Sequence, residues 1–375
     1  MEIIGYISIL IALLYTILIV VFTISWFKIP QFNCIPKNPE DQRTNFSILI
    51  PFRNEEINLP KLFNDLEAQN YPNSLFEVIL IDDESNDNSN KTARNIIASS
   101  KLQCKLLNSR NGKKKALQLG LNQASGDFII TFDADVRIEI NHLECFHQFY
   151  KKTKAKLIAG PITFSHNNSL LSRILSLEFT SLITSGAAAM HIGKPIMLNA
   201  ANMGFERKIA LEFQSEVYQS GIASGDDQFL MEAIEREYGS KCIHFLKSKA
   251  AIAVTKPPEN IQSFINQRIR WASKTSAYKS RFSQFVALLI LLFNFSLILN
   301  IGFSIYLNSA LPFLILFALK FIIDLPILLN ATVFFKQGYL LLYYPLIQLI
   351  YPWYIVGIAI MSFFPKYNWK GRNIG

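Results

Sequence analysis

The sequence predicts an α/β domain with a mixed, mainly parallel sheet, flanked by membrane-spanning helices on both sides. Short apolar runs alternate with segments of helical spacing between residues 45 and 132, which is the pattern of a parallel sheet covered on both faces. Hydrophobic residues make up 50% of the 375 positions, and they are concentrated near the two ends of the sequence. A chain of this length accommodates one α/β domain of roughly 200–250 residues in addition to those apolar ends.

An N-terminal transmembrane anchor is expected over residues 1–28. Residues 3–26 carry no charge, and a helix needs roughly 20 apolar residues to span a bilayer. A cleaved signal peptide is the alternative, but no basic residue precedes the apolar stretch and no small-residue cleavage site follows it.

The last third of the chain contains further apolar segments, at residues 282–307, 311–335 and 339–364. Lys320 and Asp324 interrupt the second segment, and their spacing of four residues places them on one helix face, where they can pair. Charges at membrane depth are costly and usually face protein or water, so this segment is either a span with an inward polar face or a re-entrant segment. We therefore expect two or three spans over residues 282–365, followed by a short basic tail at 366–375.

The net charge of +9 is explained better by membrane flanks than by nucleic-acid binding. Basic residues follow the first apolar run and precede the second, and such residues mark the cytoplasmic side of a membrane. The α/β domain is therefore expected in the cytoplasm, at the inner membrane of a cell, with the N-terminus outside. Four full spans would place the basic tail outside, against the same rule, so the number of spans stays open. The four scattered cysteines show neither metal-ligand spacing nor a disulfide framework.

The expected α/β domain covers residues 44–255, and its polar residues cluster where its strands end. Strands are predicted at residues 46–51, 77–81, 104–107 and 128–132, with helices between them. Ligands bind beyond the carboxyl ends of the strands in such sheets. The side chains at those ends are Arg53, Glu55, Asp82, Asp83, Asp133 and Asp135. The sequence has neither GxGxxG nor GxxxxGK[ST], so a dinucleotide-dependent dehydrogenase and a P-loop enzyme lose their main support.

Asp133 and Asp135 form a DxD pair directly after the fourth predicted strand. Two carboxylates at this spacing can bind a divalent cation, and hard oxygen ligands suit Mg²⁺ or Mn²⁺. The cation would neutralise a diphosphate as it leaves. A solvated loop is the alternative for an isolated DxD, and the position after a buried strand favours the metal site.

Two further segments have a structural and a functional interpretation, and the sequence leaves both open. Asp226 and Asp227 open a predicted helix at residues 228–237, where they either cap the helix or supply a general base for an acceptor hydroxyl. Residues 267–271, QRIRW, lie in an interfacial helix segment expected at 256–281. They form either a basic interfacial helix with a Trp at the headgroup level, or a site in which Arg binds phosphate and Trp stacks on a sugar.

Six motifs in sequence order resemble the family 2 glycosyltransferases, above all their membrane-integrated branch, which includes cellulose, chitin and hyaluronan synthases and simpler lipid or carotenoid glycosyltransferases. The motifs are PFRNEE at 51–56, IDDESND at 81–87, GKKKAL at 112–117, DAD at 133–135, GDD at 225–227 and QRIRW at 267–271. Each motif alone is weakly specific, whereas all of them in order at plausible spacing are strongly specific. The resemblance covers residues 45–271 and implies a GT-A-type nucleotide-sugar-binding fold.

The resemblance further implies an inverting transfer from a nucleotide-diphosphate sugar, expected to be a UDP-sugar, with Mg²⁺ or Mn²⁺ as the cofactor. The donor-binding residues would be Pro51, Arg53, Glu55, Asp82, Asp83, Lys115 and Asp133. Asp135 would be the principal metal ligand, with Asp133 beside it on the sugar-diphosphate side. Asp227 would be the catalytic base, with Asp226 in a supporting role. The residues that would close over the diphosphate and the acceptor are Gln267, Arg268, Arg270 and Trp271.

The sequence departs from the family at Glu84, where the family usually has Gly, and this change alters the turn without removing a ligand. Residues 199–205 (NAANMGF) resemble the family's acceptor-side segment, with tight packing as an equal alternative. Residues 181–190 form either an interfacial helix beside the acceptor or a buried helix of the domain.

A lipid-linked or membrane-near hydroxyl is the expected acceptor, because processive synthases usually have more spans than this chain. A processive polysaccharide synthase subunit is the alternative, since processive members also carry QRIRW, and the involvement of partner subunits stays open. A non-catalytic sugar-nucleotide-binding subunit is disfavoured because Asp135 and Asp227 are both present. A transporter is disfavoured because the apolar segments contain few charges.

Overall fold

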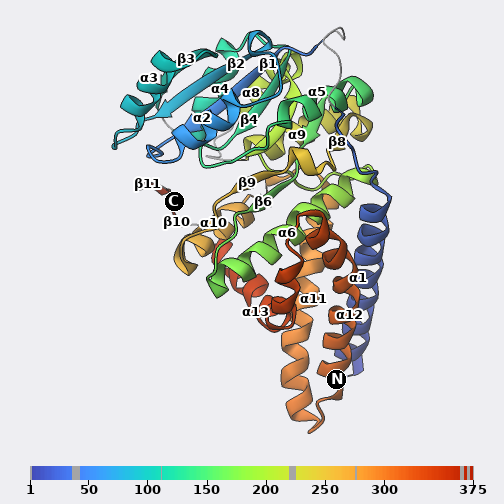
Figure 1. Ribbon diagram of the computed structural model, residues 1–375. Helices are drawn as coiled ribbons and strands as arrows, with labels where there is room; N and C mark the ends of the chain where they lie inside the picture. The colour runs from blue at the N-terminus through green and yellow to red at the C-terminus, as the bar shows by residue number, and fades with distance from the viewer. Residues whose placement is uncertain are drawn as a thin grey trace. The chain divides into compact units, whose positions relative to one another are not determined.

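The computed structural model describes residues 2–35, 43–110, 112–218, 225–274, 277–363, 367–369 and 372–374, and it forms two compact units (Figure 1). The sheet unit consists of Pro30–Ser165 and Gly193–Lys256, and the helical unit consists of Met1–Ile29, His166–Ile192 and Pro257–Gly375. The predicted domain at 44–255 therefore includes one stretch of chain, residues 166–192, that packs with the helical unit.

Seven strands form the main sheet of the described residues, in the order β3-β2-β1-β4-β7-β5-β8. They are β1 (Phe46–Phe52), β2 (Phe76–Asp83), β3 (Gln103–Ser109), β4 (Phe128–Phe132), β5 (Leu157–Ala159), β7 (Asn202–Glu206) and β8 (Ile243–Phe245). β3, β2, β1 and β4 run parallel, β7 is antiparallel to β4 and β5, and β8 is parallel to β5. The predicted mixed, mainly parallel sheet is confirmed.

Helices pack on the sheet because its central strands are apolar on both faces. Every residue of β1, β2 and β4 is buried, so both faces need cover. The helical segments of the sheet unit are α2 (Leu59–Glu67), η1 (Asn73–Leu75), α3 (Ser89–Ser99), α4 (Lys113–Gln123), α5 (His142–Thr153), α7 (Arg207–Glu212), α8 (Gln214–Tyr218), α9 (Asp226–Tyr238), η2 (Ser240–Cys242) and η3 (Lys249–Ala251). A second, two-stranded sheet pairs β6 (Ile162–Phe164) with β9 (Ala253–Thr255). α4 lies so close to the sheet that a Cβ atom at Gly120 would come within 3.0 Å of Ile81 Cδ1.

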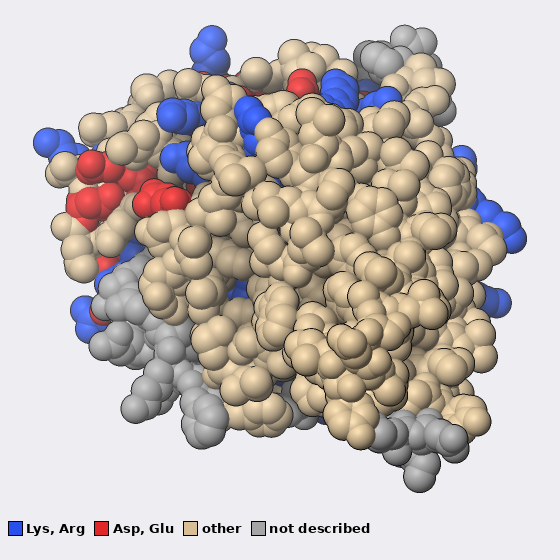
Figure 2. All heavy atoms as spheres, turned by 90° about the horizontal axis from the view of Figure 1, so that it is seen from below, with Lys and Arg blue, Asp and Glu red and all other residues tan. Residues whose placement is uncertain are grey.

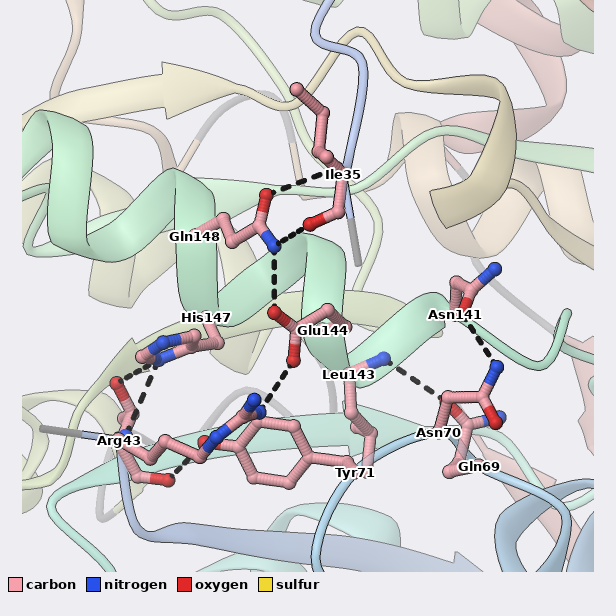
Figure 3. A network of polar contacts seen from close by, with 11 residues as sticks. Ile35, Arg43, Gln69, Asn70, Tyr71, Asn141, Leu143, Glu144, His147 and Gln148 are labelled. Atoms are coloured by element: carbon pink, nitrogen blue, oxygen red, sulfur yellow. Dashed lines mark hydrogen bonds and ion pairs between the residues drawn. The ribbon is translucent and has the colours of Figure 1, made fainter. Parts of the chain in front are cut away.

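The chain segments on either side of residues 36–42 are attached to α5 (Figure 3). Gln148 Nε2 donates to the Ile35 carbonyl (2.5 Å), and Gln148 Oε1 accepts from the Ile35 backbone N–H (3.2 Å). Arg43 forms an ion pair with Glu144, with 2.6 Å between Nη1 and Oε2. Gln148 Nε2 also donates to Glu144 Oε1 (2.6 Å), so one short stretch of α5 holds the chain where it approaches β1.

The helical unit contains α1 (Glu2–Lys28), α6 (Leu170–His191), α10 (Ile261–Ala272), α11 (Arg281–Tyr306), α12 (Leu311–Phe334), η5 (Gly338–Tyr343), α13 (Tyr344–Ser362) and a hairpin of β10 (Tyr367–Trp369) and β11 (Arg372–Ile374). Among the described residues, four segments are long and apolar enough to cross a membrane, namely Gly5–Lys28, Arg281–Tyr306, Leu311–Phe334 and Gly338–Ser362. Large apolar side chains are exposed on them, including Ile9, Leu299, Ile322 and Trp353. Residues other than Lys, Arg, Asp and Glu occupy most of the face drawn in Figure 2. Exposed apolar area of this extent is typical of a membrane-contacting surface.

Charged groups inside the apolar helices are paired. Lys320 Nζ donates to Asp324 Oδ2 (2.5 Å) and to Gln348 Oε1 (2.7 Å). Tyr15 of α1 donates through its hydroxyl to Asp324 Oδ1 (2.7 Å). The pairing predicted from the spacing of four residues is confirmed. α12 is one continuous helix with Pro326 inside it, and its charged face is turned towards α1 and α13.

Candidate active site

The end of β2 carries two buried carboxylates that are held by hydrogen bonds. Asp82 and Asp83 have exposed fractions of 5% and 1%. Asp82 Oδ1 accepts from the Ser85 backbone N–H (2.9 Å), and Asp82 Oδ2 accepts from Asn90 Nδ2 (2.7 Å). Asp83 Oδ1 accepts from the backbone N–H of Gly112 (2.9 Å), which ties the end of β2 to the start of α4. Both carboxylates therefore have a defined orientation before any ligand binds.

The loop after β1 folds back onto the end of β2. Arg53 is buried, and its Nη1 donates to the Asp83 carbonyl (2.8 Å). Pro51 lies inside β1, two residues before Arg53. The backbone N–H of Glu55 donates to Ser89 Oγ (2.6 Å) at the start of α3. The structure therefore brings the residues predicted for the nucleoside to one end of the sheet, and their contacts with a donor stay a prediction.

Three consecutive lysines begin α4, and their side chains diverge. Lys113 Nζ contacts Asp133 Oδ1 after β4. Lys114 is buried, with its Nζ 5.3 Å from the ring centre of a phenylalanine on α9. Lys115 is exposed, and its Nζ donates to Gln118 on its own helix (3.3 Å). The lysine that pairs with the DxD motif is thus Lys113, whereas the sequence predicts a donor role for Lys115.

The ammonium of Lys113 is surrounded by carboxylates from two elements. Burial disfavours its charge, but attraction by Asp133, Asp226 and Asp227 outweighs burial and raises the pKa of Lys113 above its ordinary value. Asp226 and Asp227 are the first residues of α9, and Asp226 is 7% exposed. The end of β4 and the start of α9 therefore form one acidic cluster that attracts the ammonium of Lys113, and Asp226 also attracts that of Lys114.

The segment before β7 connects this cluster to the sheet. The backbone N–H of Ala200 donates to Asp227 Oδ2 (3.3 Å), and the Ala200 carbonyl accepts from Thr131 Oγ1 on β4 (2.6 Å). Asp227 Oδ1 also accepts from the backbone N–H of Gln228 (2.9 Å), which is an interaction with the start of its own helix. Asp227 therefore contacts the start of its own helix and also belongs to the acidic cluster, so the two interpretations left open by the sequence do not exclude each other.

Asp133 and Asp135 suit a divalent cation that takes its other ligands from a bound diphosphate and water. Within the described part of the chain, no group of three or more His, Cys, Asp or Glu side chains is arranged to hold a metal alone. Mg²⁺ typically binds one or two carboxylates together with substrate phosphates and waters, so the oxygen donors of a DxD pair fit this mode. Asp135 Oδ2 accepts from Thr255 Oγ1 (3.0 Å), which leaves its carboxylate oriented by β9.

The predicted residues 267–271 lie on α10 in the helical unit, and Arg268 differs from the others. Its side chain is 4% exposed and forms an ion pair with Glu178 of α6. Gln267, Arg270 and Trp271 are partly exposed on the same helix. Their predicted contacts with diphosphate and acceptor stay predictions.

Sequence reasoning missed Lys113 and Glu178, and it singled out residues 199–205 without assigning a role to Ala200. Lys113 follows the glycine of the GKKKAL motif. Because Ala116 and Leu117 are buried, the spacing along the helix places Lys113 on their side of α4 and Lys115 on another side. Ala200 acts through its backbone, so the segment that contains it does not indicate its contact with Asp227. Glu178 lies in a long apolar helix outside any motif and gives no local signal.

The family comparison is consistent with this site. Residues 47–210 match the family model described as glycosyl transferase family 2. This likeness to the family covers less than half of the chain. The matched range includes the ends of β1, β2 and β4 and the start of α4, where most of the clustered polar residues lie.

Two named relatives and one solved structure extend this comparison. The undecaprenyl-phosphate 4-deoxy-4-formamido-L-arabinose transferase of Aeromonas hydrophila is 42% identical over 99 residues, 24% of this chain and 29% of that protein. Glycosyltransferase AglE of Haloferax volcanii is 24% identical over 200 residues, 53% of this chain and 64% of AglE. The matches thus span less than two thirds of the length of these relatives.

The solved structure is the mannosyltransferase PcManGT from Pyrobaculum calidifontis in complex with GDP-Man and Mn²⁺. It is 16% identical, covers 96% of this chain and 99% of its own, and has a TM-score of 0.61. At this identity the likeness concerns the fold, and it supports the GT-A-type architecture expected from the sequence.

Proposed function

We propose that the protein is an inverting glycosyltransferase that moves a sugar from a nucleotide-diphosphate donor to the hydroxyl of a lipid-linked or membrane-near acceptor. The observation that carries this proposal is the acidic cluster of Asp133, Asp226 and Asp227 around Lys113, at the carboxyl end of β4 in a family 2 domain. Such a cluster combines a carboxylate for proton removal with groups that can hold a cation and a diphosphate.

Asp227 is the proposed general base. Its carboxylate accepts hydrogen bonds from the Ala200 and Gln228 backbone N–H groups, which keep it oriented. The acceptor hydroxyl gives its proton to Asp227, the acceptor oxygen bonds to the anomeric carbon, and the bond from that carbon to the diphosphate breaks. Attack opposite the leaving group inverts the configuration.

Asp133 and Asp135 would hold Mg²⁺ or Mn²⁺, which when bound neutralises charge on the leaving diphosphate. Lys113 would add a second positive charge on the same side, so we assign it the donor role that the sequence predicts for Lys115. Asp82, Asp83 and the residues after β1 would contact the nucleoside, with a UDP-sugar as the proposed donor. Asp226 would support Asp227 from the preceding position of the helix.

A lipid-linked acceptor is supported by the four apolar helices and by the Aeromonas hydrophila relative, whose name includes undecaprenyl phosphate. We place the reaction at the cytoplasmic face of the inner membrane, following the distribution of basic residues. A processive polysaccharide synthase subunit is the second candidate, and the same helices would then serve a growing chain.

The first test incubates the purified full chain, in detergent with native lipid extract, with Mn²⁺ and a panel of radiolabelled nucleotide sugars. We expect label to enter the organic-soluble fraction with one UDP-sugar. Label in a polymer would favour the synthase, and label in neither fraction with any donor would contradict transferase activity. Addition of EDTA should abolish transfer, and undiminished transfer in EDTA would remove the metal role of Asp133 and Asp135.

The second test replaces the base. Asp227→Asn should lower kcat by about 10²- to 10⁴-fold, because a carboxamide cannot take the proton, while donor binding persists. Asp127→Asn is the matched control, since Asp127 is an exposed aspartate just before β4, at the opposite end from the site. Near wild-type turnover in Asp227→Asn would exclude the base assignment.

A further inference from the structure

A buried ion pair joins α6 to α10 inside the helical unit. Glu178 and Arg268 each have side chains that are 4% exposed. Arg268 Nε donates to Glu178 Oε1 (3.1 Å), and Nη2 donates to Glu178 Oε2. This is a bidentate contact, which fixes the plane of the guanidinium as well as its position.

Glu178 also contacts the last long helix of the unit. The hydroxyl of Tyr354 on α13 donates to Glu178 Oε1 (3.0 Å). The Tyr354 ring stacks on Phe264 of α10, with 5.4 Å between ring centres and an interplanar angle of 29°. One carboxylate on α6 therefore holds side chains of both α10 and α13, and its removal would leave Arg268 buried without its counter-charge.

The other faces of the Arg268 guanidinium touch two residues of the QRIRW segment. Nη1 donates to Gln267 Oε1 (2.8 Å), and the guanidinium carbon lies 4.3 Å from the ring centre of Trp271. An arginine uses its edge for hydrogen bonds and its face for an aromatic ring, so all three contacts are compatible at once. The orientation that Glu178 imposes on Arg268 is thereby passed on to Gln267 and Trp271.

We propose that Glu178 is a positioning residue that acts through Arg268 to hold Gln267 and Trp271 in the arrangement used for the acceptor. This inference rests on the proposed function, because it takes acceptor recognition as the task of these α10 side chains. Arg268 then contacts its neighbours rather than the substrate, and its charge is balanced within the helical unit.

The experiment compares Glu178→Gln with Asp324→Asn in the detergent-purified full chain. Asp324→Asn is the control for general loosening, because the hydrogen bonds of Asp324 go to Lys320, Tyr15 and Gln348. Glu178→Gln should raise the KM for acceptor about 10- to 100-fold, as expected of misplaced substrate-orienting groups, with donor affinity within about twofold of wild type. Glu178→Asp keeps the charge and should recover part of the loss. An equal rise in acceptor KM in Asp324→Asn, or no rise in Glu178→Gln, would overturn the proposal.

A second measurement reports on positioning without transfer. The emission contributed by Trp271 is obtained by subtracting the fluorescence spectrum of Trp271→Phe from that of the parent. This difference spectrum should change in Glu178→Gln and stay constant in Asp324→Asn. If wild type transfers no sugar but the difference spectrum changes, the proposed function has failed while the positioning contact stands; an unchanged spectrum refutes the contact itself. Where Glu178→Gln does not fold, Glu178→Asp and Tyr354→Phe give the same two readouts, and unchanged values in both would contradict the proposal.

Discussion

Two lysine–aspartate pairs occur in different parts of this chain, and their surroundings are opposite. Lys113 and Asp133 have side chains that are 28% and 39% exposed, and further carboxylates at the start of α9 act on the same ammonium. Lys320 and Asp324 are 3% and 13% exposed, and Tyr15 and Gln348 complete their hydrogen bonds. We call Lys113 and Asp133 the open pair, because both side chains are partly exposed and negative charge is in excess around them. We call Lys320 and Asp324 the closed pair, because both side chains are mostly buried and their charges balance.

The difference is the one expected between the proposed binding site and a purely structural contact. An open pair can exchange its partner, because a metal ion or diphosphate can replace one of its contacts while water still reaches both groups. A closed pair inside apolar helices has no such exchange, and breaking it leaves a charge where solvation is poor. The closed pair therefore links α1, α12 and α13, whereas the open pair is accessible to the proposed ligands.

The largest expected effect concerns the closed pair. Asp324→Ala should destabilise the protein by about 3–5 kcal/mol, because Lys320 stays buried without its counter-charge. The apparent Tm of the detergent-purified chain measures this loss. The double variant Lys320→Met, Asp324→Leu removes both charges and should recover most of the stability, since no buried charge is left uncompensated. Equal destabilisation in the single and double variants would show that the pair is not the source of the effect.

A buried histidine in the sheet unit provides a second closed contact. Asn202 Nδ2 donates to the carbonyls of Pro161 (2.7 Å) and Ala251 (3.0 Å), so Asn202 Oδ1 accepts from His142 Nε2 (3.1 Å). His142 Nδ1 is buried without a hydrogen-bond partner among the described residues. Burial lowers the pKa of His142 to about 4 and outweighs the hydrogen bond to Asn202, which alone would raise it.

The sign of the pH effect follows from this lowered pKa. The unfolded histidine, with a pKa of about 6.5, binds a proton before the folded one does, so stability is full above that pH and falls as pH drops towards 4. The loss should approach about 3 kcal/mol, measured as the Tm of the full chain across this range. His142→Phe should show a flatter pH profile, and an unchanged slope would assign the effect to other groups.

The central strands and the acidic edge were predictable because their signals are local. β1, β2 and β4 are runs of buried apolar residues, and each ends at the polar residues that form the site. β5 and β8 have three residues each, too few for a pattern to distinguish them from loops. α6 was not assignable to a unit, since its apolar composition suits a membrane-side helix and a domain helix equally.

Side-chain direction on helices was the harder part of the site. Lys113 and Lys115 differ by two positions, which places them on different sides of α4, and the side that meets Asp133 depends on how the helix packs on the sheet. Arg268 lies four residues after Phe264, so both face the interior of the helical unit. Its partner, Glu178, is 90 positions away in sequence, and no spacing rule connects the two.

The next prediction tests the open pair with the two lysines of α4. Lys113→Met should raise the KM for the nucleotide-sugar donor by about 10- to 100-fold, as expected for loss of a charged hydrogen-bond partner. Lys115→Met is the matched control and should change it by less than about twofold, because Lys115 is exposed and bonds within its own helix. Steady-state kinetics at saturating Mn²⁺ measures both. A larger rise in donor KM in Lys115→Met than in Lys113→Met would assign the donor role to Lys115. The Lys113–Asp133 pair would then have no role in donor binding.

The smallest expected effect concerns backbone strain in the turn after β2, close to the open pair. Glu84 follows β2 with φ at +56°, a region that glycine adopts freely and that costs other residues about 1–2 kcal/mol. Its carboxylate lies 3.9 Å from the Arg110 guanidinium, but both side chains are largely exposed, so this contact contributes little.

Glu84→Gly should therefore stabilise the protein by about 0.5–1 kcal/mol, since relief of the strained φ exceeds the added entropy of the unfolded chain. Glu84→Ala is the control, because it removes the carboxylate while keeping the strained backbone. The difference in Tm between the Gly and Ala variants isolates the backbone contribution. If Ala stabilises as much as Gly, the carboxylate and its repulsion by the neighbouring Asp82 and Asp83 are the source of the strain. Charge repulsion, rather than the strained backbone of the turn after β2, would then reduce the stability at this position.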